Sequence, residues 1–100
     1  MIIMANNSMG IDRLAADTTA KAATAWVRQI VRVIGVCFHP DEPFSSYRDE
    51  SGAALFTPER CVALDADLAR AWDILDSAGM DIYAIGLSEQ RRILAVARCR

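Results

Sequence analysis

The sequence predicts a mostly α-helical protein, with three helices in one domain and a proline- and aromatic-rich loop between the first two. Three observations support this fold class. Apolar residues recur at helical spacing along three long segments. Residues that typically start or end helices flank the second and third segments. A chain of 100 residues suffices for one hydrophobic core, so we expect a single helical domain over 11–100 after a flexible segment at 1–10.

The first helix is predicted over residues 12–36. At a period of 3.6 residues, its large apolar side chains fall within one arc of roughly 160°, opposite the charged ones. That arc contains Trp26, Val27, Ile30, Val31, Val33, Ile34, Cys37 and Phe38. Towards the N-terminus the same arc continues in small residues. This side is interpreted either as part of a lightly packed core helix or as a surface for a second copy.

The predicted length of this helix favours the second interpretation. A helix of about 25 residues would measure about 37 Å, which is more than a domain with a radius of gyration near ~13 Å covers easily. We therefore expect a homodimer whose seam includes Ala15, Ala22 and Trp26.

Residues 38–49 form the candidate binding site. Pro40 and Pro43 exclude a helix there, and the aromatic rings in this loop can each bury a large apolar area. We expect the loop to be ordered and packed on the helices. The candidate binding residues are Phe38, His39, Asp41, Phe44, Tyr47 and Arg48.

His39 is the only histidine of the chain. We expect it to cap the C-terminus of the first helix by donating to its last carbonyl oxygens. Cys37 and His39 also allow a zinc site or a nucleophilic pair, but their spacing matches no standard zinc-ligand pattern. Residues two apart at a helix end seldom face each other. The sequence therefore predicts no metal, no cofactor and no catalytic residue.

After the loop, residues 49–52 have turn composition, which predicts either a short β-hairpin or a tight irregular loop with Gly52 at positive φ. The second helix is predicted from its N-cap Thr57 and first residue Pro58 to Gly79. Its buried stripe is Cys61, Leu64, Leu68, Trp72 and Leu75. Asp65, Asp73 and Asp76 are too far apart along the helix for one ion.

Asp81 is the predicted N-cap of the third segment. Residues 82–87 either begin one helix that continues to Arg98, or end at a break marked by Gly86, with Ser88 starting a new helix.

Charge is unevenly distributed along the chain. The net charge is +2 over residues 1–40, −7 over 41–81 and +3 over 82–100, which sum to the total of −2. We expect acidic and basic elements to face each other, within the fold or across a dimer. The alternative is a basic surface for an anionic ligand. The acidic total argues against a nucleic-acid partner, and no segment is long and apolar enough for a membrane.

Three widely spaced cysteines, Cys37, Cys61 and Cys99, indicate free thiols in a cytoplasmic protein. Together these features predict a small cytoplasmic helical module for protein–protein interaction that pairs with itself and, as an option, with another protein. The alternative function is small-molecule binding or catalysis at a site under residues 38–48. A non-enzymatic role is favoured.

Overall fold

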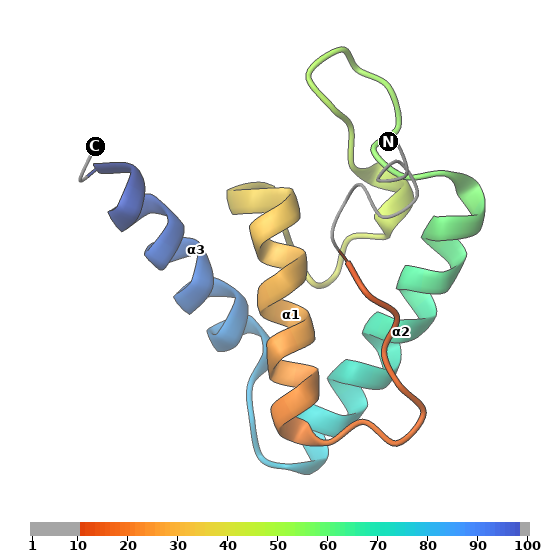
Figure 1. Ribbon diagram of the computed structural model, residues 1–100, viewed down its shortest axis with the longest axis vertical. Coiled ribbons are helices and arrows are strands. Elements are labelled where there is room, and N and C mark those ends of the chain that lie inside the picture. Colours follow the sequence, from red (N-terminus) through yellow and green to blue (C-terminus); the bar gives the residue numbers. More distant parts are fainter. Residues whose placement is uncertain (1–10, 99–100) are drawn as a thin grey trace, which may run out of the picture.

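The computed structural model describes residues 11–98, and three helices form its body (Figure 1). The helices are α1 (Ala20–Ile34), α2 (Pro58–Ser77) and α3 (Ile82–Arg98). Two short 3-10 turns, Gly35–Cys37 and Phe44–Ser46, lie in the connection between α1 and α2. α1 stands between the other two helices and packs against both. The mostly helical, three-helix fold is confirmed, whereas the segment expected at 1–10 lies outside the described residues.

The N-terminal boundary of the first helix was predicted wrongly. α1 begins at Ala20 and has 15 residues, because Thr19 has extended backbone and its side chain accepts a hydrogen bond from the N–H of Ala22 at 3.2 Å. Thr19 is therefore the N-cap. Residues 11–19, here called the strap, precede the helix and contact both α1 and α2. Ala15 thus lies in the strap and not on a helix, so helix length no longer supports a dimer.

Polar side chains of α2 hold the strap by its backbone. The Arg60 guanidinium donates to the carbonyl of Ile11 at 2.9 Å. Asp67 accepts from the N–H of Leu14 at 3.1 Å, and Arg70 donates to the Leu14 carbonyl at 3.1 Å. Ile11 and Leu14 are themselves buried in the core. The strap is therefore held by two buried apolar side chains and by hydrogen bonds from its backbone to side chains of α2.

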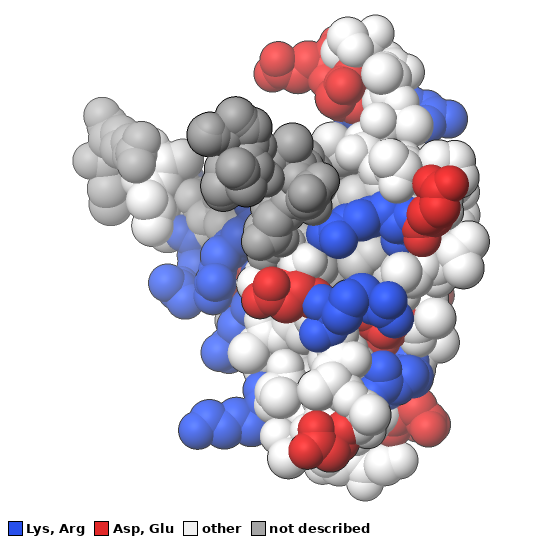
Figure 2. All heavy atoms as spheres, turned by 45° about the vertical axis from the view of Figure 1, so that its right-hand side comes forward, with Lys and Arg blue, Asp and Glu red and all other residues white. Residues whose placement is uncertain are grey.

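Asp67 makes several of the contacts between α2 and the strap, and its side chain is fully buried. Arg13 donates to its two carboxylate oxygens at 2.6 and 3.2 Å, and Arg70 lies 3.5 Å away. Burial by itself would raise the pKa of Asp67, but the hydrogen bonds from Arg13 and Leu14 and the two cations outweigh it and hold that pKa below its ordinary value. Figure 2 shows basic and acidic side chains side by side over much of the α2 side of the molecule.

The boundaries of α2 are those the sequence predicts. Thr57 accepts from the N–H of Arg60 at 3.2 Å, and Pro58 is the first helical residue. At the other end Gly79 has φ of +75°, and the N–H of Met80 donates to the carbonyl of Leu75 at 2.8 Å. This is the turn that a glycine after a helix allows.

α3 is one unbroken helix. The Asp81 carboxylate accepts from the N–H of Tyr83 at 3.0 Å, as expected of an N-cap. Gly86 does not mark a break. It is buried within the helix, where the ring of Phe38 lies 3.6 Å from the position a Cβ would occupy. Between residues 11 and 98, no helix is long and apolar enough to cross a membrane.

The β-hairpin is not confirmed. Residues 11–98 contain no strand, and one isolated antiparallel bridge joins Arg48 to Ala54. The turn between them is closed by the Asp49 carboxylate, which accepts from the N–H groups of Ser51 at 2.8 Å and Ala53 at 3.1 Å. Hydrogen bonds from Ser51 and Ala53 lower the pKa of Asp49. Gly52 has the expected positive φ, +89°.

A second buried carboxylate joins α1 to α3. Glu89 is 3% exposed, and its Oε2 accepts from Nε of Arg32 at 3.0 Å. Its Oε1 lies 3.6 Å from Arg92 and has no hydrogen-bond partner among the described residues. Arg32 and Glu89 are 57 positions apart in the sequence, so this ion pair links α1 to α3 across the fold.

Candidate functional site

The loop between α1 and α2 is fixed by its three aromatic rings. Phe38, Phe44 and Tyr47 are 5%, 1% and 8% exposed. The ring of Phe44 packs edge-on against Phe56 with centroids 5.7 Å apart, and lies 5.9 Å from the ring of Tyr47. These three candidate binding residues therefore belong to the core and offer no surface to a ligand.

Hydrogen bonds close the same loop. The Tyr47 hydroxyl donates to the carbonyl of His39 at 3.1 Å and accepts from its N–H at 2.9 Å. The N–H of Phe44 donates to the Asp65 carboxylate on α2 at 3.0 Å. Burial is the main cause of the raised pKa of Tyr47, and the backbone hydrogen bond to His39 opposes it. The phenol therefore stays protonated near neutral pH, which preserves both of its hydrogen bonds.

His39 does not cap α1, which corrects the expectation from the sequence. Its Nδ1 accepts a hydrogen bond from the N–H of Asp41 at 3.2 Å, so that nitrogen carries no proton to donate. The carbonyls at the end of α1 are instead reached from α3. Nε2 of Gln90 lies 3.4, 3.3 and 3.0 Å from the carbonyl oxygens of Gly35, Val36 and Phe38. Gln90 fills the role expected of the histidine.

The exposed part of the loop meets the start of α3. Tyr83 donates from its hydroxyl to the Asp41 carboxylate at 2.6 Å, and its ring lies edge-on to His39 at 5.9 Å and to Trp72 at 5.5 Å. The hydrogen bond to Asp41, with smaller effects of burial and nearby acids, raises the pKa of Tyr83. Tyr83 is thus a hydrogen-bond donor at neutral pH and not a base.

Sequence reasoning did not connect Tyr83 and Trp72 with the loop. They lie 42 and 31 positions from Asp41, and no motif links them to it. His39, Asp41 and Tyr83 are more than a third exposed. They form a polar and aromatic surface patch whose imidazole, carboxylate and phenol groups can form hydrogen bonds with another molecule.

Arg48 is not brought to this patch. It lines a separate cavity of about 650 Å³ beside the turn, together with the ends of α1 and the acidic residues of the turn. Its lining residues are Val33, Ile34, Arg48, Asp49, Glu50, Ser51 and Leu55. Residues 38–47 line neither this cavity nor the three others described for residues 11–98.

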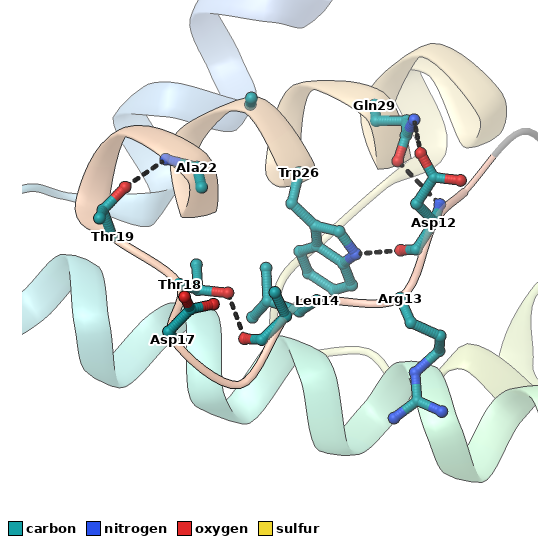
Figure 3. A pocket seen from close by; sticks show the side chains of 11 residues that line it. Asp12, Arg13, Leu14, Asp17, Thr18, Thr19, Ala22, Trp26 and Gln29 are labelled. Carbon is teal, nitrogen blue, oxygen red and sulfur yellow. Dashed lines mark hydrogen bonds between the residues drawn. The ribbon is translucent and has the colours of Figure 1, made fainter.

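The three predicted dimer-seam residues meet in one groove, between the strap and α1 (Figure 3). The groove has a volume of about 410 Å³, and Ala15, Ala22 and Trp26 all line it. Ala15 and Ala22 are exposed, whereas Trp26 is 4% exposed. The indole N–H donates to the carbonyl of Asp12 at 2.8 Å, so the tryptophan is a wall of the groove held from within the protein.

The remaining polar groups of the groove hold each other. Gln29 accepts from the N–H of Asp12 at 3.0 Å and donates to its carboxylate at 3.4 Å. The Thr18 hydroxyl donates to the carbonyl of Ala15. Figure 3 shows the Thr18 contact at one end of the groove and the contacts between Gln29 and Asp12 at the other, with the indole of Trp26 between them. The strap is thereby kept at a fixed distance from α1.

Cys37 is exposed, contrary to its predicted place on the buried arc, and Cys61 is buried; both thiols are free. Desolvation is the main cause of the raised pKa of Cys61, with a contribution from Asp65. Over residues 11–98 no three His, Cys, Asp or Glu side chains are grouped so as to hold a metal ion. Cys99 lies outside the described residues.

Comparisons of the chain with protein-family models, with curated proteins and with solved structures found no match.

Proposed function

We propose that this protein is a small cytoplasmic helical module for protein–protein interaction, and that it acts as a homodimer. The observation that supports the proposal is the groove between the strap and α1. Its lining combines the exposed alanines Ala15, Ala22 and Ala25 and the indole of Trp26 with polar residues of the strap and α1. The small side chains allow another helix to approach closely. In a two-fold dimer the same surface is used twice, so α1 of one copy lies along the groove of the other.

The surrounding structure makes this groove suitable for a partner. The strap is fixed to α2 by Asp67 and Arg70 and to α1 by Trp26, so the groove exists before binding and ordering it costs little on association. The cytoplasmic assignment rests on the free thiols of Cys37 and Cys61. A ligand site beneath the loop is not proposed, because the rings of Phe38 and Phe44 are packed into the core there.

The test is the molar mass in solution at about 10–100 μM, a range in which modest interfaces associate. We expect the mass of two chains for the natural protein and of one chain for Ala22→Glu, which places a charge in the groove. Ala97→Glu, at an exposed alanine of α3, is the matched control and should remain dimeric. A single-chain mass for the natural protein would refute the dimer. A dimeric Ala22→Glu variant would refute this seam.

A further inference from the structure

A second surface lies on the side of α3 that faces away from α1. The exposed side chains Ala84, Leu87, Arg91, Leu94 and Arg98 follow each other at intervals of three and four residues. This spacing places them in one stripe along the helix. Leu87 and Leu94 are 47% and 44% exposed, so the stripe presents two large apolar side chains to solvent.

The arginines of this stripe are free to bind another molecule. Arg92, just beside the stripe, pairs with Glu89, whereas Arg91 and Arg98 make no ion pair with any residue from 11 to 98. The stripe also borders a shallow cavity of about 370 Å³. That cavity is lined by Ala84, Leu87, Ser88, Arg91, Arg92 and Ala95. The face is thus apolar, indented and positively charged.

α2 carries a stripe of opposite character. Val62, Ala66, Ala69, Asp73 and Asp76 are exposed and follow each other at the same intervals of four and three residues. Val62 is 72% exposed. Asp73 and Asp76 make no ion pair with another residue in the described range. This face is apolar with small side chains along its middle and negatively charged towards its C-terminal end.

We propose that the α3 stripe of one copy docks on the α2 stripe of a second copy. Helices whose contact residues recur at alternating intervals of three and four pack side by side, with large side chains fitting between small ones. Leu87 and Leu94 supply the large side chains, and Ala66 and Ala69 leave space for them. The arginines of α3 then lie against the aspartates of α2, and opposite charges across a contact select the partner and its alignment.

α1 stands between α2 and α3 (Figure 1). On each of the outer helices the exposed stripe lies on the side away from the buried residues of that helix, so the two stripes face different sides of the molecule. One copy can therefore bind a second copy through α3 and a third through α2. Such a head-to-tail contact does not close into a pair and extends into longer assemblies. It is distinct from the groove between the strap and α1 and goes beyond the dimer proposed above.

The test uses two variants. Each reverses the charge of one of the two stripes. Arg91→Glu/Arg98→Glu makes both stripes acidic, and Asp73→Arg/Asp76→Arg makes both basic. We expect the mean mass of the natural protein to rise, between about 0.1 and 1 mM, above the mass measured at about 10–100 μM, because weak contacts form in the higher range. Each variant by itself should show no such rise. An equimolar mixture of the two should restore it, since every α3 then finds an α2 of opposite charge.

Two controls keep the result specific. Arg48→Glu reverses an exposed arginine outside both stripes and outside α1 and should associate like the natural protein. Circular dichroism should show unchanged helix content in every variant. Added salt at about 0.5 M should weaken the natural association, because it screens exposed charges.

Three results would overturn the proposal: no rise in mass for the natural protein, an undiminished rise in Arg91→Glu/Arg98→Glu, or no recovery in the mixture. These results are independent of the seam test, because Ala22 lies in neither stripe.

Discussion

The side-chain amide of Gln90 donates a hydrogen bond to the backbone carbonyl of Phe38 at 3.0 Å, so a residue of α3 closes the end of α1. The carbonyls that this amide reaches belong to the turn that follows Ile34, the last residue of α1, and Gln90 lies more than 50 residues further along the chain. The same amide reaches the carbonyl of Gly35. The exit from α1 and the start of the aromatic loop therefore depend on α3.

Replacing Gln90 should destabilise the protein more than replacing His39. Gln90→Ala removes the only side-chain donor that reaches these carbonyls from the described residues, and we expect a loss of about 1 kcal/mol in unfolding free energy. Gln90→Glu should cost more, because a carboxylate would face carbonyl oxygens. Urea denaturation measures both. A larger loss in His39→Ala than in Gln90→Ala would show that the histidine is the true cap.

Phe44→Ala should lower the free energy of unfolding by about 3 kcal/mol or more, the usual cost of removing a buried aromatic ring. Phe44 is 1% exposed and contacts the rings of Tyr47 and Phe56. The control is Val36→Ala, at a side chain that is 53% exposed; it should change stability by less than about 0.5 kcal/mol. An unchanged melting temperature in Phe44→Ala would mean that the loop is not anchored in the core.

Stability should fall in acid because of Asp67. Its pKa is lowered in the folded protein, so its contribution is fully present above the unfolded value of about 3.9 and is lost as the pH falls through the lower folded value. Asp67→Asn should flatten the dependence of unfolding free energy on pH below about 4. Asp73→Asn, at an exposed carboxylate, controls for the loss of one charge. Equal slopes in Asp67→Asn and the natural protein would contradict this account.

The Tyr83 phenol should ionise at higher pH than a free tyrosine, and Asp41→Asn should bring its pKa back towards the ordinary value. The chain has two tyrosines, so Tyr47→Phe leaves Tyr83 as the one phenol that ultraviolet absorbance follows. Because the folded pKa is raised, the hydrogen bond stabilises the fold below pH ~10 and is lost as the pH rises through the folded value. A titration unaffected by Asp41→Asn would show that the two side chains do not interact in solution.

The sequence predicted those helix ends that depend on neighbouring residues. Thr57 and Pro58 mark the start of α2, Gly79 its end and Asp81 the start of α3, because caps act over three or four positions. The start of α1 was missed although Thr19 caps it locally, because the apolar pattern before Thr19 was interpreted as part of the helix. The alanines before Thr19 fit a helical pattern, but the strap is held by Asp67 and Arg70, more than 50 residues away, and local periodicity carries no information about such contacts.

For the candidate site, too, local features could be predicted from the sequence and long-range contacts could not. The large aromatic residues and the neighbouring prolines predict that the loop is anchored. The sequence does not reveal which of its side chains point into the core. Phe38 and Phe44 are core residues, whereas His39 and Asp41 remain at the surface. The Tyr83 that joins them lies on α3, and only packing against α1 brings that helix to the loop.

The way α2 holds the strap has a consequence for how this protein can change. Asp67 accepts from the N–H of Leu14 and Arg60 donates to the carbonyl of Ile11. Every residue type offers a main-chain carbonyl, and every type except proline offers an N–H. Substitutions at the outward-facing positions of the strap should therefore be tolerated without loss of these hydrogen bonds. Inserting or deleting a single residue between Ile11 and Leu14 is different, because it moves one apolar anchor out of its place and shifts the backbone past the charges that hold it. Across natural variants, the strap should vary in composition while keeping its length.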